Sequence, residues 1–184
     1  MKLDASIVAR LRDELLEKGQ RPTLILSPAY EPLTRAGLLT DEESAALERV
    51  DAVVEAMFLM MAADGDVAEE ELDVIRGAIR VLTSSVLRSG TIAVMLETYE
   101  ERLKTEGWEA RLIKLADQLS RTTWAAETAY GLSAAVALAD REVTLEENEL
   151  IDRLGELLGI TDQRCCELLE LIKQQGTPPW GGEP

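Results

Sequence analysis

Two short acidic segments carry the side chains in this sequence that are best suited to bind a metal ion. The first runs from Ala63 to Ile75 and the second from Ala139 to Ile151. Both read Ala-Asp-x-acid-Val-x-x-Glu-Glu-x-x-aliphatic-Ile. Carboxylates two residues apart on a turn can converge, and a Glu on the following helix can complete the ligand shell. Each segment is therefore a candidate cation site.

The candidate ligands are the acids of the two turns and of the helices that follow them: Asp64, Asp66, Glu71, Asp140, Glu142 and Glu147. Ligand sets made only of oxygen favour Ca²⁺, Mg²⁺ or Mn²⁺ over Zn²⁺. The spacing is not that of an EF-hand, because the twelfth position counted from Asp64 is Ile75, where that loop needs Glu. We expect the first segment to supply most of the site and the second to assist it.

A purely structural interpretation of the same acids stays open. Asp and Glu near a helix N-terminus satisfy free N–H groups and the positive end of the helix dipole. Thr144 and Glu147 form a capping box, which needs no ligand. Asp64 and Asp140 can close turns through their own backbone.

The elements that position these segments are predicted to be helices. A capping box, Thr40-Asp-Glu-Glu43, predicts a helix that continues to Ala63. Apolar periodicity predicts an N-terminal helix over residues 3–18, and Pro22 and Pro28 then bracket a connector. Further helices are predicted over about 69–82, 91–104, 108–119, 124–139, 144–158 and 161–174.

This pattern predicts an all-α protein, a compact bundle of about seven or eight helices built from two repeated helix–turn–helix units. We divide the chain into residues 1–44 (N-terminal helix and connector), 45–175 (helical domain) and 176–184 (a Pro/Gly tail expected to be disordered). The adjacent cysteines, Cys165 and Cys166, are expected to be reduced, with one facing the core.

Composition excludes several classes of function. The chain has 184 residues, a net charge of −16 and no His, which removes His-dependent triads and imidazole metal sites. Negative charge opposes binding to nucleic acid or an anionic membrane. Residues 41–71 hold 11 acids and one base, so we expect an acidic surface around the two turns. With neither a signal peptide nor a membrane-spanning run, we expect a cytoplasmic protein without membrane insertion.

The two Asp turns resemble those of the tellurite-resistance TerB-like family, whose mark is Ala-Asp-Gly-x-Val followed by Glu, used twice. Here the copies are Ala63–Val67 with Glu71 and Ala139–Val143 with Glu147. The second copy has Arg141 in place of Gly, and its guanidinium could occupy the place of a cation. The resemblance spans about residues 45–172, and the N-terminal domain of certain membrane-anchored J-domain co-chaperones is similar too.

The resemblance implies a non-enzymatic, TerB-like helical domain that binds a divalent cation weakly and docks a protein partner in a stress response to tellurite or metal. A second hypothesis is metal-free protein–protein interaction, as in a co-chaperone's regulatory module. A third is a hydrolase that uses paired carboxylates, which would need an enclosed cleft and a carboxyl group of raised pKa.

Overall fold

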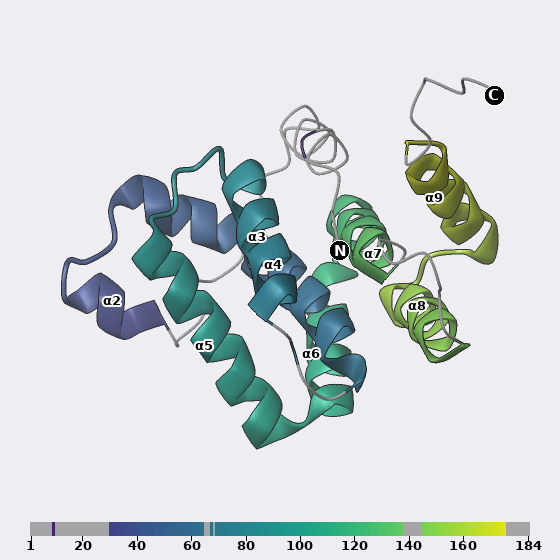
Figure 1. Ribbon diagram of the computed structural model, residues 1–184, viewed down its shortest axis with the longest axis horizontal. Coiled ribbons are helices and arrows are strands. Elements are labelled where there is room, and N and C mark those ends of the chain that lie inside the picture. Colours follow the sequence, from purple (N-terminus) through teal and green to yellow (C-terminus); the bar gives the residue numbers. More distant parts are fainter. Residues whose placement is uncertain (1–8, 10–29, 65–66, 68, 138–144, 176–184) are drawn as a thin grey trace.

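The computed structural model describes residues 9, 30–64, 67, 69–137 and 145–175 (Figure 1). Over these residues the chain forms eight α-helices and one 3-10 turn, with no strand, which confirms the predicted all-α bundle. The elements are α2 (Glu31–Arg35), α3 (Asp41–Met61), η2 (Ala62–Asp64), α4 (Glu69–Leu82), α5 (Ser89–Glu106), α6 (Trp108–Leu119), α7 (Thr123–Ala137), α8 (Leu145–Leu158) and α9 (Asp162–Gln175). None of the helices in this part of the chain is both long and apolar enough to span a bilayer.

Helix α3 begins as the capping box predicts. The Thr40 hydroxyl accepts a hydrogen bond from the Glu43 N–H at 3.2 Å, and the Glu43 carboxylate accepts one from the Thr40 N–H at 3.1 Å. The two bonds satisfy donors that a helix start leaves free. The helix ends at Met61, before the predicted Ala63, because residues 62–64 tighten into the 3-10 turn η2.

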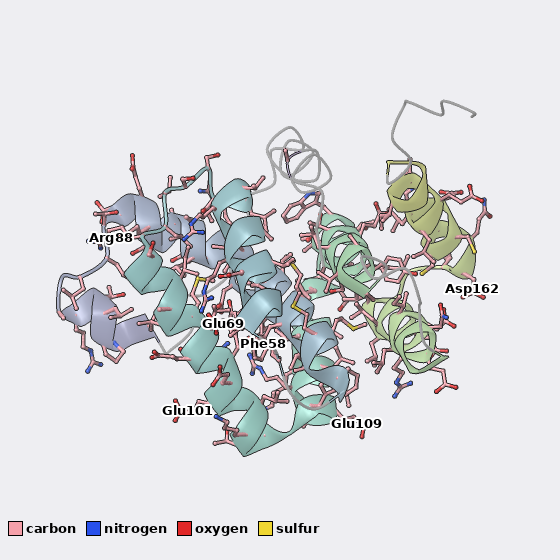
Figure 2. All side chains as sticks on the ribbon, in the orientation of Figure 1. Phe58, Glu69, Arg88, Glu101, Glu109 and Asp162 are labelled. Carbon is pink, nitrogen blue, oxygen red and sulfur yellow. The ribbon has the colours of Figure 1, made fainter. Side chains whose placement is uncertain are left out.

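Helices α3 and α7 form the centre of the molecule and make its most extensive helix–helix contact. The apolar run of α3 is buried, and Phe58 lies in the interior of the bundle (Figure 2). Every residue of α7 from Thr128 to Ala137 is buried. Many of them are Ala, Gly or Ser, whose small side chains let the backbones of α3 and α7 approach closely.

The bundle consists of two halves with matched helices. The first comprises α3, α4 and α5 and the second α7, α8 and α9, which lie on opposite sides of Figure 1. The shift along the chain that takes Ala63 to Ala139 also takes both ends of α4 to those of α8, and the last residue of α3 to that of α7. A smaller shift relates the starts of α5 and α9, because the loop before α9 is shorter than the loop before α5. The repeat seen in the sequence is therefore a repeat of the fold.

The short helix α2 is an element that the sequence did not predict. Residues before 45 were assigned to an N-terminal helix and a connector, but α2 lies within that connector and α3 crosses the boundary at residue 44. With five residues, α2 is too short to show helical periodicity, and Pro32 near its start suits a first turn. Tyr30, directly before it, is fully buried.

Candidate functional site

The structure places only part of the predicted metal site. Asp64 ends η2, and Glu71 and Glu147 lie in the first turns of α4 and α8. Their side chains, and the whole of Asp66, Asp140 and Glu142, lie outside the described residues. Thr144, Arg141 and the C-terminal tail lie outside them as well. Convergence of the six carboxylates therefore stays a prediction.

The helices on either side of the two acidic turns are described, and they are equivalent. The first turn joins α3 to α4 and the second joins α7 to α8, and the helices of each pair pack against each other. Because α3 and α7 also pack together, the helices that lead into the turns belong to one core. Both turns thus occupy the same position in their halves of the fold.

The acids that follow the first turn are partly neutralised within the protein. Arg76 donates to Glu69 at 2.6 Å and to Asp73 at 2.8 Å, and these contacts raise the pKa of Arg76. Among the side chains that the structure does describe, no three potential metal ligands come together. On α4, the described acids are thus engaged by an arginine.

A buried carboxylate, Glu55, forms a charge network that the sequence analysis missed. Its side chain is 1% exposed and accepts hydrogen bonds from Arg102 of α5 and Arg111 of α6. Arg111 donates through two nitrogens, Nε to Oε1 and Nη2 to Oε2, the latter at 2.8 Å. Both arginines are nearly nine-tenths buried. One carboxylate of α3 therefore fixes the positions of two other helices.

Asp51 lies one turn before Glu55 and binds two buried tyrosines. Its Oδ1 accepts from the hydroxyl of Tyr30 at 2.6 Å and from that of Tyr99 at 2.9 Å. Burial, together with the nearby Asp51 charge, raises the pKa of both tyrosines, so both donate as neutral phenols. The Arg102 guanidinium lies 3.8 Å from the other Asp51 oxygen, which links the two carboxylates into one network.

The carboxylate of Glu43 has a second role besides its part in the capping box. It accepts from Arg88 at 2.8 Å (Nε) and 2.7 Å (Nη2), and from the Thr91 hydroxyl at 3.2 Å. Hydrogen bonding to Arg88 outweighs the opposing effect of burial and lowers the pKa of Glu43 to about 2. The residue joins the start of α3 to the start of α5.

These contacts take three acids of the segment 41–71 away from the expected acidic surface. Glu43, Asp51 and Glu55 belong to the acidic segment 41–71 but lie in the interior or half-buried, each bound to a base or a phenol. By contrast, Glu101, Glu109 and Asp162 are exposed on the outside (Figure 2). The signal that could have revealed Glu55 is its place within the apolar run Ala52–Met61, because an acid there must find a buried partner.

The second half has a smaller counterpart of this network. Glu127 of α7 is the repeat equivalent of Asp51 and accepts from Arg164 of α9 at 2.9 and 2.8 Å. The position equivalent to Glu55 is Gly131, which is buried. The Glu127–Arg164 pair borders a pocket of about 270 Å³ between the α6–α7 and α8–α9 loops, which Ser120, Thr123 and Thr161 also line.

Comparison with known proteins adds no relative, since no family model, curated protein or solved structure matches this chain. The class of protein is defined by the fold alone: an acidic all-α bundle of two related halves.

Proposed function

We propose that this protein is a non-enzymatic, TerB-like acidic module of the cytoplasm that binds a divalent cation weakly and docks a protein partner in a response to tellurite or metal stress. The cation would be Ca²⁺, Mg²⁺ or Mn²⁺, which oxygen ligands favour. Its ligands would be Asp64, Asp66 and Glu71, with Asp140, Glu142 and Glu147 of the second turn in support. The observation that carries the proposal is the equivalence of the helices around the two acidic turns.

The described carboxylates support a binding function over catalysis. A hydrolytic acid needs a raised pKa, whereas salt bridges lower the pKa values of Glu43, Glu106 and Glu167. In the pocket beside α9, Glu127 is held by two nitrogens of the Arg164 side chain, Nε and Nη2. A carboxylate bound in this way is a poor proton donor.

Calorimetry on chelator-treated protein tests the cation site. We expect heat of binding and a rise in the melting temperature with at least one of the three ions, since a ligand of the folded state stabilises it. Asp64→Asn and Glu71→Gln should abolish both effects, and Glu101→Gln on the exposed face of α5 is the matched control. No heat and no change in melting temperature with any of the ions would contradict the site.

Metal-free protein interaction is the second candidate, and the contacts of Arg76 favour it. Arg76 already balances the charges of Glu69 and Asp73 next to the first turn. If this candidate is right, neither the wild type nor the two variants bind an ion, and the melting temperature of the wild type does not change when chelator is added. The same titrations therefore distinguish the two candidates.

A further inference from the structure

Helices α4 and α8 are equivalent in the two halves, yet the described elements cover them differently. Helix α8 packs extensively on both α6 and α7, and it buries Ile151, Leu154 and Leu158. Helix α4 buries the equivalent Ile75, Ala78 and Leu82, but among the described elements only α3 makes an extensive contact with it. Among the described elements, none packs extensively on α4 at the place where α6 packs on α8.

The missing neighbour has a defined position in the fold. Helix α6 packs on α3 and α5 of the first half and on α7 and α8 of the second. A counterpart with the halves exchanged would pack on α7, α9, α3 and α4, and none of the described helices makes that set of contacts extensively.

The face of α7 at this position suits a closely packed helix. Helix α6 is attached to α3 at Glu55, through Arg111, and at Leu59, whose carbonyl accepts from the Trp108 indole at 2.7 Å. The equivalent residues of α7 are Gly131 and Ala135, both buried. These two positions carry neither a charge nor a large side chain, and Glu127, one turn earlier on the same face, is already bound by Arg164, so the positions suit a partner with an apolar surface.

The N-terminal segment has the required chemistry. Leu3, Ile7, Val8, Leu11 and Leu15 fall on one side of a helix, and Ala9, the described residue of this segment, is helical. Residues 1–29 hold five bases and four acids, against 14 and 31 in the rest of the chain, so docking is electrostatically favourable. The eleven residues 19–29 can span up to about 35 Å before Tyr30.

We propose that residues 3–18 dock as a helix against α4 and α7 and act there as the counterpart of α6. The faces of α4 and α7 would then form a helix-binding site filled by the chain's own N-terminus. This inference does not depend on the proposed cation site.

Hydrogen exchange on the full-length chain tests the proposal. Leu11→Asp places a charge on the docking face, and it should speed exchange at least tenfold in residues 72–82 of α4 and 131–137 of α7 while α8 stays protected. Ser6→Asp is the matched control, since it adds the same charge on the opposite side of the predicted helix and should leave α4 protected.

Two results would overturn the proposal. One is unchanged protection of α4 from hydrogen exchange in Leu11→Asp, and the other is an equal loss of protection in α4 and α8. Leu11→Ala provides the milder variant if Leu11→Asp unfolds the chain, with a smaller loss expected in the same two segments. Sedimentation of the wild-type protein shows whether the docked helix comes from the same chain or from a second copy of it. A dimer that Leu11→Asp converts to monomer would assign the docked helix to a second copy of the chain and contradict docking within one chain.

Discussion

The two halves of the molecule share their helix boundaries but are held together by different contacts. In the first half, Glu55, Asp51 and Glu43 bind three arginines and two tyrosines, and these bonds connect α2, α3, α5 and α6. In the second half one pair, Glu127–Arg164, joins α7 to α9, and small residues pack most of the remaining length of α7. The same helical framework thus accepts either buried charge or close backbone packing.

The largest expected effect comes from breaking the buried network. Glu55→Gln should destabilise the protein by about 3–5 kcal/mol, because it leaves two buried guanidinium groups without their shared carboxylate. The matched change in the second half, Glu127→Gln, should cost about 1 kcal/mol or less, since Arg164 is more than one-third exposed. Urea unfolding of both variants measures the difference, and equal losses would show that the halves do not differ in this way.

The second prediction probes close packing in the second half. A Cβ at Gly155 would lie 2.8 Å from the Cys165 Sγ and 3.3 Å from the Tyr130 ring. Gly155→Ala should therefore cost about 1–3 kcal/mol, and Cys165→Ala in the same chain should recover part of it. Gly77→Ala in α4 meets nothing within 4 Å and should stabilise the helix by about 0.5–1 kcal/mol. Thermal unfolding that ranks the two glycine variants in the opposite order would contradict this packing.

The third prediction concerns the pH dependence of the Glu43 contact. Its pKa falls from 4.5 in the unfolded chain to about 2 in the folded one, so the contact stabilises the fold above pH 4.5 and loses its effect as the pH falls towards 2. Glu43→Gln should lower the free energy of unfolding by about 1–2 kcal/mol at pH 7 and by nearly nothing at pH 2. The value at pH 7 is modest because Arg88 is exposed and solvent screens the ion pair. Unfolding free energies of wild type and variant across this range should converge on acidification; a constant gap would contradict the contact.

The smallest effect is expected at the loops that end α4 and α8. Both helices close with the same backbone bond, from Ser85 N–H to Arg80 O at 2.7 Å and from Ile160 N–H to Gly155 O at 3.0 Å. The first loop has two left-handed residues, Ser84 (φ 50°) and Ser85 (φ 60°), and Ser84 occupies the position that Gly159 (φ 70°) has in the second loop. Ser84→Gly should stabilise by up to about 1 kcal/mol and Gly159→Ala should destabilise by about 1 kcal/mol, as measured by thermal unfolding.

Local sequence patterns predicted most helices correctly. The capping box at Thr40 located the start of α3, and the predicted end of α8 at residue 158 is the observed one. The predicted bounds of α4 and α6 agree with the structure. Met57 and its neighbours, which continue the apolar periodicity of α3, are buried. These predictions hold because capping and apolar periodicity act between residues a few positions apart.

The candidate site and the charge network were less accessible to the sequence. The acidic turns were identified by their repeat, but a repeat does not show whether carboxylates so far apart in the chain converge. In the sequence, Glu55 is part of an acidic segment and Arg111 is part of a predicted helix, and neither pattern indicates that the two residues bind each other. Tyr30 and α2 were assigned to a connector because no local pattern marks them.

By itself, the sequence determined the approximate bounds of helices α3 to α9, their pairing into two halves and the lack of histidine chemistry. Each of these depends on residue types and on spacings of one or two helical turns. Only the tertiary structure decided which acids are internal, which helix covers which, and where the halves differ. Those outcomes depend on contacts between residues about 20 to 60 positions apart, such as Tyr30 with Asp51 and Glu55 with Arg111, and such contacts leave no periodic trace in the chain.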